Sequence, residues 1–321
     1  MGETTAIEWC HHTFNAWEGC ARVSPGCENC YAEARDKRFT GGIRWGVKAE
    51  RRIASEAYWR QPLKWNAEAQ AAGERRRVFC ASLADVFEDR PELAEPRARL
   101  WDLMLATPWL DWLLLTKRPE NAERLARAAT VRAFHDLGAP HHTSSFPPNA
   151  WLGVTAENQA YADKRIPIML GIAGPAVYFV SYEPALGPVD FTRVGTDDGR
   201  PVSALARHPV VDPPAERGAP GVDWIIVGGE SGTDARPFDL AWARNVIAQC
   251  KAAGVAAFCK QLGAVPVSTH DADLCGRVGD VVEVRFESPS LFHVALKSKK
   301  GGDMSEWPED LRVREFPEVP R

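Results

Sequence analysis

The sequence predicts an α/β fold built as a partial or complete β/α barrel with a C-terminal extension. Short apolar runs, typical of strands buried on both faces, alternate with longer segments of helical character from Arg77 to Cys259. Polar or charged side chains directly follow most of these runs. The alternation implies parallel βαβ units with right-handed crossovers, and about six or seven such units suit a barrel. We expect the barrel domain to span residues 1–264 and the extension residues 265–321.

The individual elements follow from this alternation. The first strand and the first helix are expected over residues 13–17 and 29–38. The apolar runs that predict the later strands lie at residues 77–82, 112–117, 151–155, 177–181, 224–228 and 255–259. The helices between them are expected at residues 93–106, 119–129, 158–170 and 240–253.

Three kinds of segment depart from the alternation. Residues 135–148 and 192–221 are rich in Gly, Pro, Asp and His, which indicates surface insertions. In the extension, residues 281–286 alternate like an antiparallel strand. Residues 297–321 are charged and contain proline, so we expect an arm that lies over the domain.

The composition is that of an ordinary globular protein, with 45% hydrophobic and 26% charged residues in a chain of 321. No apolar run is long enough to cross a membrane and no secretory segment is recognisable, so we expect a cytoplasmic protein without membrane contact. The eight cysteines show no pairing pattern, which favours a reducing compartment. The net charge of −4 argues against binding polyanions through bulk charge. Residues 45–65 interleave basic and aromatic side chains; they suit nucleic-acid binding or, as we prefer, a helix with buried aromatics.

Three cysteines, Cys20, Cys27 and Cys30, lie close together with Cys-x6-Cys-x2-Cys spacing. The first two fall on a turn-rich loop and the third opens the first predicted helix, whose N-terminus favours negative charge. Three thiolates suit an iron–sulfur cluster, and a four-iron cluster would keep one iron open to another molecule. A zinc site is the alternative, with a tetrahedral shell completed by one of three nearby residues, Cys10, His11 or His12.

Ligands of parallel α/β sheets bind beyond the carboxyl ends of the strands, so the residues that follow the predicted strands are the candidates for a site. These residues are Ser82, Asp85, Thr116, Lys117, Arg118, Thr155, Glu157, Asn158, Ser181, Glu183, Gly229, Glu230, Ser231, Arg236, Lys260 and Gln261. Polar residues follow many strands simply because loops are exposed to solvent. Solvent exposure explains less well why a carboxylate or a cation follows almost every predicted strand. Gly228 and Gly229 would let a ligand approach the backbone closely, although they match neither a P-loop nor a dinucleotide fingerprint.

Several sequence blocks resemble a known family. The blocks are Ile7-Glu8-Trp9, the segment 15–32 with the three cysteines, Ser82-Leu83-Ala84-Asp85, Leu115-Thr116-Lys117-Arg118-Pro119, Trp151-Leu152-Gly153-Val154, Ser181-Tyr182-Glu183-Pro184, Gly228-Gly229-Glu230-Ser231-Gly232 and Lys260-Gln261-Leu262-Gly263. Over residues 5–264 the chain resembles the three-cysteine phage-protein family, a domain of unknown function found in phages and bacteria. That family is in turn similar to divergent radical S-adenosylmethionine enzymes, which carry a four-iron cluster at the mouth of a partial β/α barrel.

The resemblance implies a function and a set of site residues. It implies a [4Fe-4S] cluster, reductive cleavage of S-adenosyl-L-methionine with electrons from a separate donor, and an unknown substrate, with a nucleic acid or nucleotide as one expectation. The implied metal ligands are Cys20, Cys27 and Cys30. The remaining candidates come from their position after successive strands. By that position, the expected catalytic residues are Asp85, Lys117, Glu183 and Glu230. The expected cofactor-binding residues are Ser82, Glu157, Asn158, Gly228, Gly229, Arg236 and Lys260.

Two other functions remain open at this point. One is a nucleic-acid-binding protein with a structural zinc or iron–sulfur site, against which a convergence of carboxylates argues because anions repel phosphate. The other is an iron–sulfur DNA-repair enzyme that uses no S-adenosylmethionine. In all of these functions, we expect the four scattered cysteines not to be ligands: Cys80, Cys250, Cys259 and Cys275.

Overall fold

The computed structural model describes residues 5, 7–137, 144–196, 199–206, 220–268, 282–284, 291–294 and 296–319. The chain forms an α/β fold whose main sheet has seven strands in the order β1-β4-β5-β6-β7-β8-β10. Two compact units divide the chain. The first comprises Met1–Val154, Ile168–Tyr178 and Val319–Arg321, and the second comprises Thr155–Pro167 and Phe179–Glu318.

The predicted α/β class is confirmed. The strand pairs β1–β4, β4–β5, β5–β6, β7–β8 and β8–β10 are parallel, as the alternating pattern requires. Within the described residues, β1 and β10 end the strand order, so this sheet is open rather than a closed barrel. Among those residues no helix has the length and apolar character needed to cross a bilayer.

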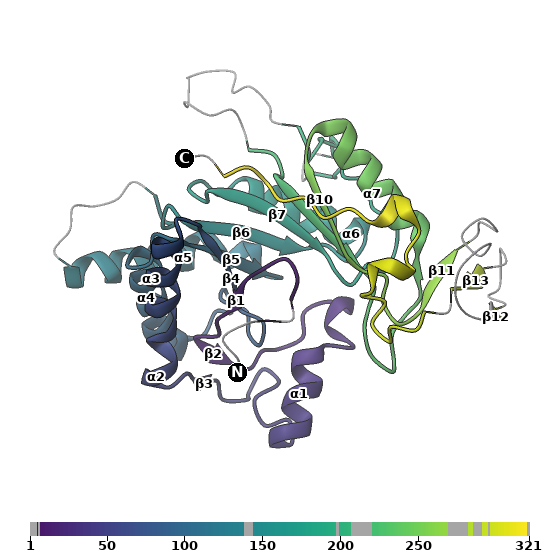
Figure 1. Cartoon of the computed structure of the whole chain (residues 1–321). Coiled ribbons are helices and arrows are strands. Elements are labelled where there is room, and N and C mark those ends of the chain that lie inside the picture. Colours follow the sequence, from purple (N-terminus) through teal and green to yellow (C-terminus); the bar gives the residue numbers. More distant parts are fainter. Residues whose placement is uncertain are drawn as a thin grey trace. The chain divides into compact units, whose positions relative to one another are not determined.

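The core of the first unit is a group of strands buried along nearly their whole length. They are β4 (Arg76–Cys80), β5 (Leu110–Thr116) and β6 (Ala150–Thr155). The helices of this unit are α3 (Gln61–Ala72), α4 (Ala94–Leu105) and α5 (Pro119–Leu137), with the short turn η2 (Pro91–Leu93) before α4. In Figure 1, α4 and α5 run beside each other. Pro119 begins α5, where its missing N–H costs nothing.

The N-terminal part of this unit is less regular than predicted. In place of one strand over residues 13–17 there are two short strands, β1 (His12–Thr13) and β2 (Trp17–Glu18), and β2 pairs with β3 (Arg52–Ile53). After the turn η1 (Pro25–Cys27), helix α1 spans Tyr31–Thr40. It ends at Gly41, which has a positive φ of 77°.

The basic and aromatic stretch at residues 45–65 has the preferred structure, a helix with buried aromatics, only in its second part, because residues 45–55 contain the short strand β3 and no helix. It includes the short helix α2 (Glu56–Trp59) and the start of α3. Trp59 and Trp65 are each only 3% exposed, so these rings pack in the core and are closed to a ligand.

The second unit holds β7 (Val177–Tyr182), β8 (Trp224–Gly228) and β10 (Ala256–Gln261). Helix α6 (Gln159–Leu170) precedes β7, and α7 (Leu240–Ala253) lies between β8 and β10 in sequence and packs against both. A separate sheet has the order β12-β13-β11-β9, with strands β9 (Phe238–Asp239), β11 (Pro266–Ser268), β12 (Val282–Val284) and β13 (Leu291–His293). β12 and β13 are antiparallel, which confirms the predicted strand for residues 282–284.

Parts of three expected segments fall outside the described residues. These are the insertions at 135–148 and 192–221 and the start of the extension at 265–281. Cys275, expected not to be a ligand, also lies outside them.

Candidate functional site

Residues 19–30, which we call the cysteine segment, are hydrogen-bonded to the loop that follows β4. The amide of Gly19 donates a 3.0 Å hydrogen bond to the carbonyl of Leu83. Gly19 has a φ of 113°, and a Cβ there would lie 2.5 Å from the carbonyl oxygen of Arg44, so only glycine fits. Cys27 ends the turn η1 and Cys30 occupies the N-cap position of α1. Cys20, Cys27 and Cys30 are free thiols of intermediate burial.

Each of these thiols has a cation among its electrostatic neighbours. The Arg118 guanidinium donates to Cys20 Sγ (3.6 Å) and, through its other nitrogen, to the carbonyl of Ala21 (2.8 Å). Burial raises the pKa of Cys30, and Lys117 opposes that rise. The pKa of Arg22 is raised first by its hydrogen bond to Glu33, and Cys27 and Cys30 add to the rise. Each thiol of the cysteine segment therefore has a cation among its neighbours, and Cys20 also has the carboxylates of Asp85 and Glu88 near it.

Two of these thiols, Cys20 and Cys30, nevertheless favour their protonated form. Burial raises the pKa of Cys20 to about 11, with Asp85 adding to the shift and Arg118 opposing it. Burial also raises the pKa of Cys30, while the backbone amides of Glu33 and Ala32 oppose the shift. A metal would have to displace these protons, so its binding would release them.

Asp85 organises the structure beneath Cys20. It is 6% exposed, and its Oδ1 accepts from the Thr116 hydroxyl (2.8 Å) and the Phe87 amide (2.9 Å). Its Oδ2 accepts from the Lys117 amide (3.1 Å) and from Arg118 (2.9 Å). Both oxygens of this predicted catalytic carboxylate are thus engaged, and they position Arg118 against the cysteine segment.

Ser82 and Asn15 connect β4 to the start of the chain. Asn15 donates to the Ser82 hydroxyl (3.1 Å) and accepts from the Leu83 amide (2.7 Å). The Tyr31 hydroxyl donates a 2.6 Å hydrogen bond to the Ser82 carbonyl. Tyr31 directly follows Cys30, so this bond links the start of α1 to the loop after β4. Ser82 therefore lies beside the cysteine segment, as its predicted role in cofactor binding requires.

The residues proposed to complete a zinc shell lie at the other end of β4. His11 Nδ1 accepts from the amide of Arg77, and His12 is in register with Val78 and stacks on Trp65 at 4.3 Å. Cys10 Sγ contacts the carbonyl of Ile7 at 3.6 Å. Arg77 lies three residues before Cys80, the end of β4, a separation of roughly 10 Å along the strand.

In the part of the chain that the structure describes, no group of three or more His, Cys, Asp and Glu side chains is arranged to hold a single metal ion. The other described cysteines are buried, and Cys80, Cys250 and Cys259 have no exposed surface. They behave as small apolar residues, as expected.

The second unit brings Glu183 and Lys260 together. The Lys260 ammonium lies 3.0 Å from Glu183 Oε1, and both side chains are partly exposed. Glu183 follows β7 and Lys260 belongs to β10, and these strands flank β8 in the sheet. The two residues form one partly accessible ion pair rather than two independent groups.

The glycines after β8 are needed for packing. A Cβ on Gly228 would lie 2.8 Å from Glu183 Oε1, and one on Gly229 would lie 2.7 Å from the carbonyl oxygen of Leu262. The next residue, Glu230, accepts hydrogen bonds from the backbone and guanidinium nitrogens of Arg236. Close packing thus accounts for the glycine-rich sequence without a ligand.

Glu157 and Asn158 also have structural partners. Glu157 has no exposed surface and forms an ion pair of 2.7 Å with Arg165, which is itself 2% exposed. Asn158 Oδ1 accepts from the amide of Tyr161 and caps the start of α6. In this arrangement Glu157 presents no atom to a bound molecule.

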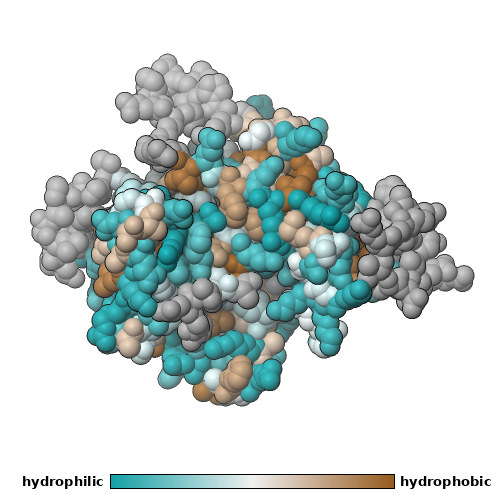
Figure 2. All heavy atoms as spheres, viewed as in Figure 1, coloured by the Kyte–Doolittle hydropathy of each residue, from teal (hydrophilic) through white to brown (hydrophobic). Residues whose placement is uncertain are grey.

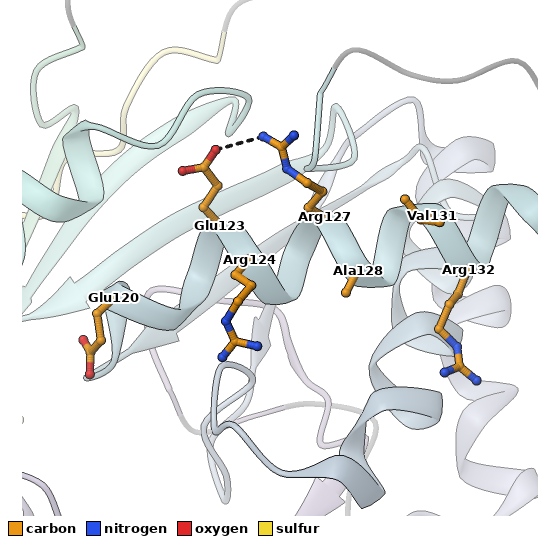
Figure 3. A pocket seen from close by; sticks show the side chains of 7 residues that line it. All are labelled: Glu120, Glu123, Arg124, Arg127, Ala128, Val131 and Arg132. Atoms are coloured by element: carbon orange, nitrogen blue, oxygen red, sulfur yellow. Dashed lines mark hydrogen bonds and ion pairs between the residues drawn. The ribbon is translucent and has the colours of Figure 1, made fainter.

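An open hollow lies along one side of α5 and is lined by that helix alone. Figure 3 shows its long side chains fanning outward, with Glu123 and Arg127 joined by an ion pair of 3.1 Å. Other arginines of the hollow pair with acids of neighbouring segments, for example Arg124 with Asp89 at 2.6 Å. This is a solvated charged helix face without the enclosure that a small-molecule site needs.

Three residues that the implied assignments leave out contribute to the cysteine site: Asn15, Tyr31 and Arg118. All three fall inside the sequence blocks that carry the family resemblance, and Arg118 also follows a predicted strand. The sequence therefore indicated these positions, but it could not identify the groups that they contact. Those groups are the carbonyls of Ala21 and Ser82, the amide of Leu83 and the thiol of Cys20.

Comparison with known proteins returns a family match. The model of a family described as "Protein of unknown function (DUF5131)" matches residues 4–303. No curated protein matches the chain, and no solved structure matches it. The expected relation to a family of unknown function is therefore confirmed, whereas the phage and radical S-adenosylmethionine resemblances stay predictions.

Proposed function

Since the chain belongs to DUF5131, a family of proteins of unknown function, we propose its function from the site: an iron–sulfur protein whose cluster is held by Cys20, Cys27 and Cys30. We further propose that an open iron binds S-adenosylmethionine, which makes the protein a divergent radical enzyme.

The observation that carries the proposal is the cation beside each clustered thiol. Arg118 donates a hydrogen bond to Cys20 Sγ. Lys117 interacts electrostatically with Cys30, and Arg22 does so with Cys27 and Cys30. Three thiolates bring negative charge into a partly buried place, and nearby cations offset the cost of that charge. Cys80 and Cys250 differ in this respect, because no cation is among the causes of the rise in their pKa, which burial leads.

A cluster suits this segment better than a four-coordinate zinc ion. Structural zinc sites are closed by four protein ligands, and the fourth ligand would have to come from Cys10, His11 or His12 near the start of β4. A cluster binds each thiolate through a different iron, so its ligands surround a space and need not converge on one ion. Three ligands are then sufficient.

The residues around the cysteines have different roles in this proposal. Asp85 and Arg118 position the Cys20 loop through buried hydrogen bonds. The Lys117 ammonium, half-buried, makes no hydrogen bond or ion pair within the described residues and is available to the carboxylate of a bound cofactor. When bound, a reduced cluster would supply one electron that breaks the sulfonium carbon–sulfur bond of S-adenosylmethionine, with methionine leaving and an external donor restoring the electron.

Iron loading tests the cluster. The protein and its Cys20→Ala, Cys27→Ala and Cys30→Ala variants are reconstituted under anaerobic conditions, and iron, sulfide, zinc and the visible spectrum are measured. We expect each variant to lose most of the iron, and the matched variant Cys250→Ala, whose cysteine is buried in α7, to keep it. Full iron content in Cys27→Ala, or stoichiometric zinc in place of iron, would contradict the cluster.

Cofactor cleavage is tested separately. The reconstituted protein is reduced with dithionite and mixed with S-adenosylmethionine, and 5′-deoxyadenosine and methionine are measured by chromatography. We expect both products, and a lower yield in Lys117→Gln at unchanged iron content. If the electron-spin spectrum of the cluster does not change on adding the cofactor and no product forms, the proposed cleavage activity is contradicted. The protein would then be an iron–sulfur protein without this activity.

A further inference from the structure

We propose that helix α1 and the segment after it, residues 31–53, form a docking surface for single-stranded nucleic acid. We call this region the α1 surface. The proposal is independent of the metal, because every observation that supports it concerns side chains of the α1 surface and the residues they contact.

The first observation is where large apolar side chains are exposed. The described part of the chain has eleven exposed large hydrophobic residues, and five of them fall within residues 31–53. These five are Tyr31, Phe39, Ile43, Val47 and Ile53. In Figure 2, hydrophobic residues lie among hydrophilic ones over α1, at the lower edge of the view. Such a concentration on one surface marks an interaction site more often than scattered exposure does.

The second observation is the charge of the same region. Residues 31–53 contain seven Lys and Arg against three Asp and Glu, a net charge of +4 in a chain whose net charge is −4. Two of the three acids face inward, with the Glu33 and Asp36 side chains 10% and 6% exposed, while Glu50 is exposed. Five of the seven cations are exposed, among them Lys37 and Arg52 at 60% and 59%, whereas Arg51 is buried against Glu88 and Arg44 is paired with Glu18. A polyanion would therefore meet a positive surface.

The third observation concerns two exposed aromatic rings. Phe39 is 68% exposed, and the guanidinium groups of Arg35 and Arg38 lie 5.6 and 5.5 Å from its ring centre. Tyr31 is 56% exposed, but its hydroxyl is tied to the Ser82 carbonyl, so the ring is held in place with much of its surface in solvent. Bases stack on such rings and phosphates pair with the adjoining arginines.

These features favour nucleic acid over the two other kinds of partner. A helix that lies on a membrane needs a row of bulky apolar side chains, whereas α1 has such residues only at its ends, Tyr31 and Phe39. An acidic protein would use the cations but gives no reason for an exposed Phe39 ring beside two arginines or for an exposed Tyr31 ring held through its hydroxyl. Tyr31 also directly follows Cys30, so a strand bound along α1 would lead to the cysteine segment.

Fluorescence anisotropy of the full-length protein with labelled oligothymidylate and oligouridylate of about 20 nucleotides tests the proposal, the length being chosen to exceed one binding site. We expect binding at low salt that weakens steeply as salt rises. The double variant Arg38→Gln/Phe39→Ala should bind about tenfold more weakly, because it loses one stacking ring and one phosphate contact. The slope of log K against log salt should fall by about 0.7.

The matched control is Arg127→Gln, which removes an exposed arginine from α5 (Figure 3) and should leave binding unchanged. Arg38 and Phe39 are both exposed, so the double variant should melt at the wild-type temperature. Equal binding by the double variant and the control would overturn the proposal. So would an absence of oligonucleotide binding, whether or not the protein binds phosphatidylserine vesicles or polyglutamate. Iron content, measured in parallel, reports on the cysteine site alone.

Discussion

Asp85 holds together the two chain segments that follow β4 and β5. Four donors converge on its carboxylate, from Phe87, Thr116, Lys117 and Arg118, and the last of these reaches Cys20. The carboxylate and the Arg118 side chain are each less than 10% exposed. Removing the charge from one member of such a pair leaves the other buried without a counter-ion, which is costly.

We therefore expect Asp85→Asn to lower the free energy of unfolding by about 3 kcal/mol. Urea denaturation of the metal-free protein measures this. The matched variant is Glu56→Gln, which breaks an ion pair of 2.5 Å with Arg99 on the exposed surface and should cause no measurable loss. An Asp85→Asn protein as stable as Glu56→Gln would show that Asp85 does not support the fold.

His11 makes the stability depend on pH in a defined window. Its Nδ1 accepts a hydrogen bond from Arg77, which requires the neutral ring, and burial together with Arg77, His12 and Arg76 lowers its pKa to about 4. The unfolded chain has the ordinary value of about 6.5, so it takes up the proton first on acidification. The contribution of His11 is therefore present above pH 6.5 and is lost as the pH falls from 6.5 towards 4.

The variant His11→Asn tests this dependence, because an amide oxygen can accept the same hydrogen bond without titrating. We expect the urea midpoint of the wild-type protein to fall more steeply than that of the variant between pH 6.5 and 4.5. The two should be parallel between pH 7 and 8. Parallel curves over the acidic range would mean that His11 is not responsible.

At the level of elements, helix α1 illustrates what the sequence conveys and what it hides. Its position was predicted to within about two residues, because the turn-rich cysteine loop marks its start. Its orientation was not predictable from apolar periodicity, because the residues it buries are Ala32, Glu33 and Asp36. Buried carboxylates that pair with Arg22, Lys37 and Arg44 replace the usual apolar stripe.

The turn after β8 shows a second such case. The sequence Gly228-Gly229 suggested a place where a ligand approaches the backbone, and the structure shows neighbouring protein atoms at that distance. Both causes produce the same sequence signal, since each excludes a Cβ atom. Only the coordinates identify the atom that a side chain would meet.

Gly229→Ala distinguishes packing from ligand contact. Its Cβ would meet the Leu262 carbonyl and the Phe238 side chain within 3 Å, so we expect a loss of about 1–3 kcal/mol in the free energy of unfolding without any ligand. Gly228→Ala should cost less, because its nearest neighbour is the movable end of Glu183. Gly302→Ala, with nothing within 4 Å, is the neutral control for the denaturation curves. If Gly229→Ala were as stable as Gly302→Ala, the close packing described for this turn would be wrong.

At the scale of the whole molecule, the parallel sheet was predictable and the site was predictable only in part. Each later strand was recognised because runs such as Leu113–Leu115 are apolar on both faces. The sequence also placed Asp85 and Glu157 after strands, but whether their oxygens face a ligand or a buried partner depends on contacts with other elements, Arg118 after β5 and Arg165 on α6. These contacts leave no local pattern.

The C-terminal arm, residues 304–319, is the part of the chain whose role was least evident from the sequence. We expected it to lie over the domain; in the second unit it covers the free edge of β10. The Cys259 amide donates to the carbonyl of Val313 and the Glu315 amide donates to the carbonyl of Ala257. Trp307 and Leu311 are buried, and Phe316 packs on Phe258. The arm lies beyond residue 303, where the match to the family ends.

A chain that ends at Asp303 should therefore be destabilised. It would expose the β10 edge, a template for pairing with other chains, and it would remove Trp307 and Leu311 from the core. Loss of one buried tryptophan alone costs about 3–5 kcal/mol. We expect a lower melting temperature and aggregation detectable by light scattering. A chain that ends at Phe316 keeps the contacts of Val313, Glu315 and Phe316 and should behave like the full-length protein. Equal melting temperatures for all three chains would show that the arm rests on the sheet without supporting it.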